Sequence, residues 1–421
     1  MSKKTKTTAT IEERRRERSV TRREFAKIAG AFGLTSALLS LAEMKSSGLF
    51  TSAEALAASA SATHKKRYLT PPKVSLKLGT SQSEETLLKT RMGTLVFISD
   101  IESRTDGAVR VEFIGSNKFC NELTCVKKCQ DGEIDLFTTT TQNAAHRTPY
   151  MNVLDFAYLW PGRAAQYYFF YHPESEPLFR DPIRKFHKLQ FLFTHCELRG
   201  IMMGKKFSDK PKSMTVGTLT GKKLRVTSTQ LGRIALKLLG TNPVPVPWKD
   251  TLKALEIGVI DGAETFSSAC AHSMVKAVSQ DIHCNLFAGN AHTSMNLDAF
   301  ERLEAHLQDA IMESSYFTQV HVQNANEAAL TNIIGTTDPP LPGTVYHKYG
   351  VKNCVWSKDE LAKAERMASP KFNPDPWKKW IVRLSRMGGV ENIFDELYAI
   401  AREIPQDTLP INVEPRRWWK G

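Results

Sequence analysis

An arginine inside an otherwise apolar strand, Leu224-Arg225-Val226, is the residue whose type and position best suit binding chemistry. Arginine keeps its positive charge at any ordinary pH, and its guanidinium presents a fork of N–H donors that fits a carboxylate in two parallel hydrogen bonds. At the end of a strand that faces a cleft, Arg225 would hold an anionic substrate and set its orientation. The other interpretation is an exposed arginine on a strand edge, paired with a carboxylate of the chain itself.

Cysteines form the second group of candidates. Cys120, Cys125 and Cys129 are the only cluster among the seven cysteines, and the last two lie four residues apart on an expected helix, where two thiolates could meet a metal ion. No CxxC pair or matching histidine spacing accompanies them, so we expect small buried residues instead. The odd total argues against a framework of secreted disulfides. An exported redox or metal protein that uses this cluster stays open as the alternative.

Catalytic motifs are absent from the sequence. It contains no G-x-x-x-x-G-K-[ST], G-x-S-x-G or H-E-x-x-H pattern and no Rossmann fingerprint. The eleven histidines are scattered, without the spacing of metal ligands. We therefore expect a protein that is not an enzyme, with no catalytic residues, no cofactor and no metal.

The charge of the chain is unevenly distributed. The 421 residues carry a formal net charge of +13, which first suggests a polyanionic partner. Residues 1–57, however, hold eleven Lys and Arg against six acids, so the remaining residues carry +8. The chain ends in the basic, aromatic segment Pro415-Arg-Arg-Trp-Trp-Lys-Gly421, whose tryptophans we expect to dock on the protein body rather than on nucleic acid or lipid. We expect no nucleic-acid partner.

The first 57 residues have the order of a secretory signal. Arg22-Arg23 with Phe25 and Lys27 precedes the mildly apolar stretch 28–42, and small residues follow around Ala53-Glu-Ala-Leu-Ala57. The twin arginines resemble a twin-arginine (Tat) signal, which predicts export of the folded protein by the Tat translocase to the periplasm. The other interpretation is an amphipathic basic surface helix. No later window is apolar over about 18 residues, so we expect a soluble mature protein.

Strands and helices alternate along the rest of the chain. Strands are expected at 74–79, 108–114 and 134–138, with helices at 84–104 and 122–130. The same order returns about 125 residues later, and Gly258-Val-Ile-Asp261 echoes Gly132-Glu-Ile-Asp135. The second set comprises 223–227, 230–239, 243–245, 250–257 and the strand that follows Gly258. The pattern predicts two parallel α/β lobes with a ligand cleft at the carboxyl ends of their strands.

The last third of the chain is mainly helical. One long helix is expected from 298 to 330, long enough to pass between two lobes. A short strand at 351–356, a helix from Lys358 and two helical patches at 377–386 and 392–404 follow.

The mature chain resembles the periplasmic substrate-binding proteins of tripartite ATP-independent periplasmic (TRAP) transporters, the DctP family. The resemblance rests on three ordered motifs: Gly-Lys-Lys-Leu-Arg225-Val, then Leu239-Gly-Thr-Asn-Pro-Val-Pro-Val-Pro-Trp248, then Thr251 through Asp261-Gly-Ala-Glu264. It covers about Val74 to Met367. It implies a type II-like, two-lobed periplasmic-binding-protein fold, with a long helix spanning both lobes and a helical C-terminal tail. The implied boundaries are an export signal at 1–57, a linker at 58–73, lobe I at 74–196 plus 289–327, lobe II at 197–288 plus 328–366, and the tail at 367–421.

The resemblance also implies a set of ligand contacts. Arg225 falls on the arginine that binds the substrate carboxylate, Arg199 on a second family arginine, and Trp248 on the aromatic that packs on the ligand. The implied substrate-binding set is Arg225, Arg199, Trp248, Thr265, Glu264, Thr140 and Gln82. The chain departs from the family where Phe119-Cys-Asn-Glu122 replaces a Leu-Gly-x-Glu turn, and where Thr265-Phe266 replaces Asn-Pro.

The implied function is capture of an organic acid by arginine–carboxylate pairing and lobe closure, followed by delivery to the small and large TRAP membrane subunits. A sensor-presenting protein with the same fold is a further possibility. The aromatic residues Trp248 and Phe266, with Tyr158 or Trp160, allow a keto or hydroxy acid, an aromatic acid or a dicarboxylate.

Overall fold

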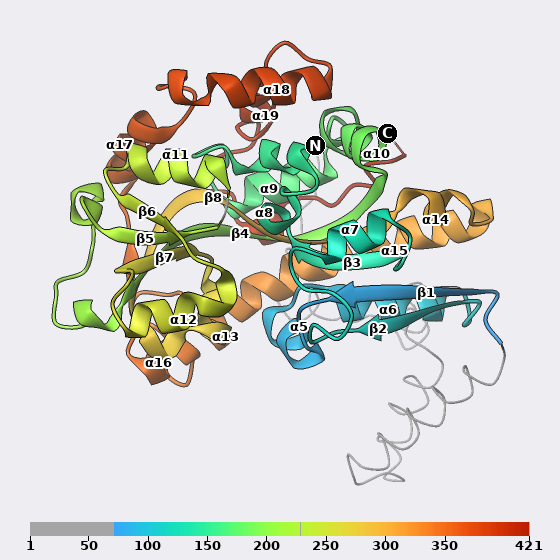
Figure 1. Ribbon diagram of the computed structural model, residues 1–421, viewed down its shortest axis with the longest axis horizontal. Helices are drawn as coiled ribbons and strands as arrows, with labels where there is room; N and C mark the ends of the chain where they lie inside the picture. Colours follow the sequence, from blue (N-terminus) through green and yellow to red (C-terminus); the bar gives the residue numbers. More distant parts are fainter. Residues whose placement is uncertain (1–70, 228, 421) are drawn as a thin grey trace, which may run out of the picture. The chain divides into compact units, whose positions relative to one another are not determined.

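The computed structural model describes residues 71–227 and 229–420; the expected export signal and most of the linker lie outside these residues. One mixed sheet of nine strands runs through the described part, in the order β2-β1-β3-β8-β4-β7-β5-β6, with β9 beside β8 (Figure 1). The strands are β1 Val74–Thr80, β2 Val109–Ile114, β3 Leu136–Thr140, β4 Leu189–Gly204, β5 Lys223–Val226, β6 Asn242–Pro245, β7 Gly262–Thr265, β8 Val278–Asn296 and β9 Lys352–Val355.

Two short parallel repeats flank a long antiparallel pair in this sheet. In the first repeat, residues 74–140, β1 lies between β2 and β3 and is parallel to both. In the second repeat, residues 223–265, β5 lies between β6 and β7 in the same way. The long strands β4 and β8 join the repeats, because β8 pairs antiparallel with β3 while β4 pairs antiparallel with β7. This arrangement agrees with the expected α/β fold class.

Helices cover the sheet and form the C-terminal tail. Those of the two repeats are α5 Glu84–Thr90, α6 Thr94–Arg104, α7 Cys125–Gln130, α11 Gln230–Leu238 and α12 Trp248–Glu256. The others are α8 Thr141–Ala144, α9 Arg163–Tyr171, α10 Asp181–His187, α13 Ser267–Ser273, α14 Leu297–Glu301, α15 Ala305–Ala329, α16 Val345–Tyr349, α17 Lys358–Ala368, α18 Lys378–Gly388 and α19 Ile393–Ile400. In Figure 1, α15 runs from α14, beside the first repeat, toward α16, beside the second.

The similar sequences Gly132-Glu-Ile-Asp135 and Gly258-Val-Ile-Asp261 form the same kind of turn, one in each repeat. Gly132 and Gly258 both end a helix with positive φ, 77° and 75°, a conformation that glycine adopts at little cost. Three residues later, the carboxylate of Asp135 accepts from Lys77 N at 2.7 Å, and that of Asp261 accepts from Lys223 N at 2.7 Å. The aspartates therefore fasten each β-strand entry to the first strand of its own repeat.

The structure corrects two expected helices. The helix expected at 84–104 is two helices, because the backbone turns at Arg91 and Gly93 with φ of 54° and 86°. A Cβ on Gly93 would lie 2.5 Å from Val322 Cγ2, so only glycine lets this turn approach α15. The helix expected at 298–330 is interrupted after α14 and starts again at Ala305.

The long strands β4 and β8 were absent from the sequence-based elements. They are 16 and 19 residues long, and nearly every residue in both is buried, on both faces of the sheet. A strand covered on both faces loses the alternation of apolar and polar residues that identifies strands in sequence.

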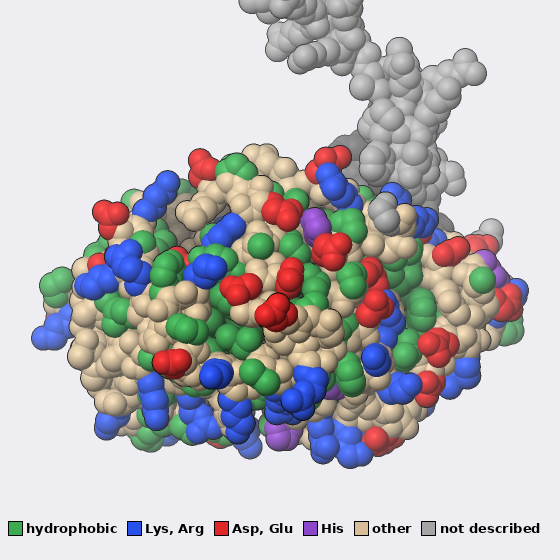
Figure 2. Space-filling model, turned by 90° about the horizontal axis from the view of Figure 1, so that it is seen from above, with side chains coloured by type: hydrophobic (Ala, Val, Ile, Leu, Met, Phe, Trp, Pro, Cys, Tyr) green, Lys and Arg blue, Asp and Glu red, His purple; other side chains and the backbone are tan. Residues whose placement is uncertain are grey.

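The tail docks on the body. Just before the tail, helix α17 packs on α11, and within the tail α18 packs on α10 and on the 3₁₀ segment Pro149–Asp155. Trp418 is buried and lies under the Arg180 guanidinium, 4.3 Å from the ring centre, which confirms docked tail tryptophans. Figure 2 views the side on which α17, α18 and α19 lie in Figure 1; acidic and basic side chains are intermingled there, with Lys and Arg gathered along the lower edge.

Within residues 71–227 and 229–420, every helix is too short or too polar to cross a lipid bilayer.

Candidate ligand-binding site

Arg199 and Glu264 form a buried ion pair in the middle of the sheet. Arg199 lies on β4 and Glu264 on β7, and these strands are neighbours. Arg199 is 4% exposed and Glu264 is fully buried. The Arg199 guanidinium also donates to Thr227 Oγ1 at 3.3 Å. Because Glu264 neutralises Arg199, this arginine is not the free cation of the site.

Arg225 is buried without a carboxylate. It lies on β5, is 3% exposed, and donates to three oxygens: Val246 O at 3.0 Å, and Thr227 Oγ1 and Glu264 O at 3.3 Å each. Among the described residues no aspartate or glutamate forms an ion pair with it. Burial lowers the pKa of Arg225 to about 10, opposed by Glu264, so its charge persists at neutral pH. A buried guanidinium that has only neutral acceptors can still take an anion.

Trp248 completes the second-repeat side of the site. It is the first residue of α12, and the Arg225 guanidinium lies 5.2 Å from its ring centre. The ring fixes one face of the guanidinium by a cation–π contact, so the fork of donors has a defined plane.

The first-repeat side carries buried oxygens that have no hydrogen-bond partner within the described part of the chain. They belong to the amides of Gln82 after β1 and Gln142 after β3. Native proteins leave few buried polar atoms unpaired, so such a group marks a place where a ligand or water supplies the missing partner.

Asp155 connects this group to the arginines. Burial raises the pKa of the Asp155 carboxyl to about 8, Arg199 opposes the rise, and Glu264 adds to it. Asp155 therefore lies within electrostatic reach of the Arg199–Glu264 pair. It is fully buried, and the Gln142 side chain lies within hydrogen-bonding reach of the carboxyl, which also opposes the rise of its pKa. At neutral pH this carboxyl is largely protonated.

The structure brings together most of the residues implied by sequence. Arg199, Arg225, Glu264, Thr265 and Trp248 converge at the end of the second repeat; Thr265 is buried beside Gly200 of β4. On the first-repeat side, the Gln82 amide has a free buried oxygen. Thr140 instead caps α8, because its hydroxyl accepts from Asn143 N at 3.2 Å.

Sequence reasoning missed Asp155. It is the only charged residue in the otherwise uncharged run Met151-Asn-Val-Leu-Asp-Phe-Ala-Tyr-Leu-Trp160, and a lone acid in such a run is a signal of a buried functional group. In the same run, the indole N–H of Trp160 donates to Leu154 O at 3.0 Å. Trp160 is therefore part of the core.

The cysteine expectation needs a correction. Cys120 and Cys125 form a disulfide, and the other cysteines, Cys129 among them, are buried thiols. The odd count of cysteines concealed the bond, because one pair can coexist with free thiols. A disulfide leaves these two sulfurs unable to act as thiolate ligands, and the described residues contain no His/Cys/Asp/Glu cluster that could hold a metal. The redox or metal alternative is therefore not supported.

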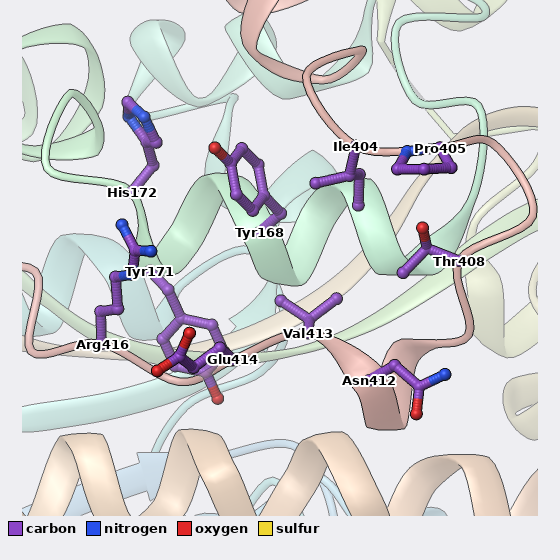
Figure 3. Close-up of a pocket in the computed structure, with 10 residues that line it drawn as sticks. All are labelled: Tyr168, Tyr171, His172, Ile404, Pro405, Thr408, Asn412, Val413, Glu414 and Arg416. Carbon is purple, nitrogen blue, oxygen red and sulfur yellow. The ribbon is translucent and has the colours of Figure 1, made fainter.

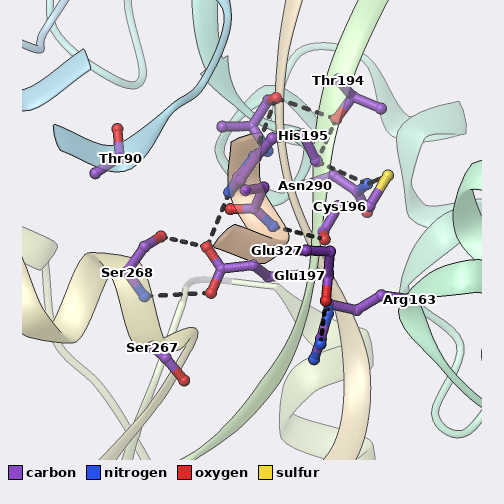
Figure 4. A network of polar contacts seen from close by, with 12 residues as sticks. Thr90, Arg163, Thr194, His195, Cys196, Glu197, Ser267, Ser268, Asn290 and Glu327 are labelled. Atoms are coloured by element: carbon purple, nitrogen blue, oxygen red, sulfur yellow. Dashed lines mark hydrogen bonds and ion pairs between the residues drawn. The ribbon is translucent and has the colours of Figure 1, made fainter. Parts of the chain in front are cut away.

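A His–Glu–Ser constellation near β4 is structural (Figure 4). Glu197 accepts from Ser268 N at 3.2 Å and from the Ser268 hydroxyl, and His195 Nε2 lies 3.3 Å from the same carboxylate. His195 Nδ1 accepts from Ala291 N at 2.9 Å, which fixes the proton on Nε2. Both ring nitrogens and both carboxylate oxygens are thus engaged, so the histidine does not activate the serine as a nucleophile. The network ties β4 to α13.

A separate cavity of about 250 Å³ lies between α9 and the tail (Figure 3). Its lining includes Tyr168, Tyr171 and Val413 and none of the arginine-site residues. The Tyr168 hydroxyl donates to Glu403 at 2.6 Å, so this polar group is already satisfied.

The chain matches one family model and is similar to several other bacterial proteins. A family model described as bacterial extracellular solute-binding protein, family 7, matches residues 79–337. A protein of Haemophilus influenzae is 26% identical over 302 residues, which cover 70% of this chain and 81% of that protein.

Solved structures with similar folds include TRAP periplasmic solute-binding proteins. One from Anaerococcus prevotii, with bound D-glucuronate, has a TM-score of 0.63 at 16% identity and covers 79% of this chain and 99% of its own. Another, from Shewanella oneidensis with bound succinate, has a TM-score of 0.62 at 14% identity and covers 79% and 100%. At these identities the likeness establishes the two-lobed solute-binding fold.

Proposed function

This chain belongs to family 7 of the bacterial extracellular solute-binding proteins, the DctP family, and we propose that it is the receptor of a TRAP transporter for an organic acid. The receptor captures the acid in the periplasm and delivers it to the small and large membrane subunits. Tat export through residues 1–57 would place the folded protein there. We propose neither an enzymatic activity nor a nucleic-acid partner.

The observation that carries the proposal is the state of Arg225. It is a buried cation whose three bonded acceptors are neutral oxygens, while the neighbouring Arg199 is neutralised by Glu264. A buried charge without an ion-pair partner is costly, and a ligand carboxylate would lower that cost. Arg199 then acts as a positioning residue that holds Glu264 and Thr227 around Arg225.

Closure of two lobes would complete the site. We place lobe I at 74–196 plus 289–327 and lobe II at 197–288 plus 328–366, with the tail from 367. The unpaired amide oxygens of Gln82 and Gln142, together with the Asp155 carboxyl beside Gln142, then face the rest of the acid and account for its orientation. Such contacts drive closure only because they exist in the closed state and not in the open one.

The test has two steps. A thermal-shift screen with glucuronate, galacturonate, galactonate, succinate and pyroglutamate selects the acid that raises the unfolding temperature, since a ligand specific to the native state must do so. Calorimetry then compares wild type with Arg225→Ala. Loss of one partner of a buried charge pair costs about 2–5 kcal/mol, so we expect affinity to fall by about 30-fold or more.

The matched control is Arg233→Ala, which removes an exposed arginine of the adjacent helix α11 and should leave the affinity unchanged. Unchanged affinity in Arg225→Ala would refute the assignment of the carboxylate to Arg225. A screen in which none of these acids binds would argue against the proposed class of ligand.

A further inference from the structure

The disulfide lies beside the candidate site. Cys120 and Cys125 are both buried and close the end of the loop between β2 and α7, residues 115–124. Cys120 Sγ sits on the carboxyl end of β1: a Cβ on Gly79 would lie 2.9 Å from it. Gln82, one of the residues with an unpaired buried oxygen, follows three residues after Gly79.

Glu122 lies between the two half-cystines and points toward the site. Its carboxylate accepts from Asn143 Nδ2 at 3.3 Å, and its backbone oxygen accepts from Thr139 Oγ1 at 3.1 Å. Both partners belong to the end of β3 and the start of α8, where Gln142 also lies. Burial raises the pKa of the Glu122 carboxyl and Arg225 opposes the rise, so this carboxyl is within electrostatic reach of the free arginine of the second repeat.

The rest of the loop is weakly held. Phe119 and Leu123 are 39% and 51% exposed, and Ser116 and Asn117 both have positive φ. Apart from Ser116 N, which donates to Gln82 O at 2.9 Å, its other ties are local, such as the Asn121 side chain that accepts from Leu123 N at 3.0 Å. A loop with so few buried contacts depends on its cross-link to keep one conformation.

We infer that the Cys120–Cys125 disulfide is a positioning element of the ligand site, which holds Glu122 against the ligand opposite Arg225. The inference rests on the proposed function. The acid is then bound from both repeats: the Glu122 carboxyl hydrogen-bonds to it from the first repeat, and the Arg225 guanidinium pairs with its carboxylate from the second. The cross-link acts through Glu122 and not through contact of its own with the ligand.

Cys129 does not replace this bond. Its thiol lies one helical turn after Cys125, is fully buried, and is 3.5 Å from Asp135 O. Burial, with the nearby Asp135, raises the pKa of the Cys129 thiol well above its usual range, so the thiol stays protonated and is a poor attacking group for disulfide exchange. Cys129→Ala is therefore a suitable control that removes one sulfur and leaves the disulfide.

A double-mutant cycle tests the inference. The acid with the largest thermal shift among glucuronate, galacturonate, galactonate, succinate and pyroglutamate is titrated into wild type, Cys120→Ala/Cys125→Ala, Glu122→Gln and the triple variant. We expect the double variant and Glu122→Gln each to bind about tenfold more weakly, since small misplacements in a site are costly. The triple variant should lose little more, because both changes remove the same contact. Cys129→Ala, and Glu133→Gln outside the loop, should bind like wild type.

Two results would overturn the inference. One is a double variant that binds like wild type, and the other is a triple variant whose losses add, because the disulfide then acts independently of Glu122. Hydrogen exchange of the unliganded protein gives a readout that needs no acid: breaking the disulfide should raise exchange in 115–124 and 141–144 but not in 246–256. Unchanged exchange in the first two segments also contradicts it. Retained binding in Arg225→Ala would instead refute the assignment of the carboxylate to Arg225, and a screen in which no acid binds would argue against the proposed function.

Discussion

The two parallel repeats have the same architecture and opposite chemistry. In each, a central strand lies between two parallel neighbours, and an aspartate after a left-handed glycine fastens the third strand to the first. The carboxyl edge of the second repeat presents a buried cation, Arg225, against Trp248. The edge of the first repeat presents the Gln82 amide, the Thr140 hydroxyl and the Glu122 carboxyl. The fold thus supplies two equivalent edges that carry different polar groups.

The repeats also differ in how they hold the loop beside the site. In the second repeat, Val246 and Pro247 alone join β6 to α12, and Arg225 binds Val246 O at 3.0 Å. Proline restricts that connection by its fixed φ. In the first repeat, residues 115–124 join β2 to α7, and a disulfide restricts the longer loop. Different covalent devices therefore restrain equivalent positions.

The largest expected effect separates the two arginines. Arg199→Ala strands the buried carboxylate of Glu264, so the free energy of unfolding without ligand should fall by about 3–5 kcal/mol. Arg225→Ala removes a cation that has no carboxylate partner, so its loss should be clearly smaller. Urea denaturation of both variants and wild type measures the difference. Equal losses would show that the two arginines are energetically alike and would contradict the comparison.

Asp155→Asn should change how stability depends on pH. An unfolded aspartate releases its proton near pH 4, while the folded Asp155 keeps it until about pH 8. Between these values the native state binds more protons than the unfolded state, so the Asp155 contribution to stability falls as pH rises. Wild type should therefore lose stability relative to the Asn variant across this range, by a total of about a few kcal/mol.

The measurement is urea denaturation of both proteins at about pH 4.5, 6 and 7.5, which lie between the pKa of Asp155 in the unfolded chain and its pKa in the folded protein. The difference between the two proteins isolates residue 155 from the other titrating groups. A pH-independent difference would mean that Asp155 ionises as in the unfolded chain, and would separate it from the arginine site.

The smallest effect tests the equivalence of the repeats. Asp135→Asn and Asp261→Asn each weaken a charge-assisted hydrogen bond of 2.7 Å, so each should cost about 1–2 kcal/mol. Asp261 also pairs with Lys206, which should add a small, salt-sensitive part. Denaturation at low and high salt measures both. If only one variant is destabilised at high salt, the two turns are not equivalent.

Local pattern predicted the repeats well because each uses short-range signals. The strand and helix order, and the Gly-x-Ile-Asp echo, correspond to turns and hydrogen bonds formed within a repeat. Arg225 was identifiable because a charge inside an apolar strand is rare. The long strands β4 and β8 gave no such signal, since they are buried on both faces. Because these two strands were not predicted, the sequence did not show that they pair with each other and join the two repeats into one sheet.

The sequence by itself determined the family, the two repeats and the position of one cation at a strand end. Only the tertiary structure decided which charged side chains have an ion-pair partner and which do not. Arg199 meets Glu264 across neighbouring strands, Asp155 lies in reach of both, and Cys120 bonds Cys125 while Cys129 stays free. The physical reason is that pairing between distant residues depends on strand order and register, set by burial of the whole sheet, which no local stretch of sequence records.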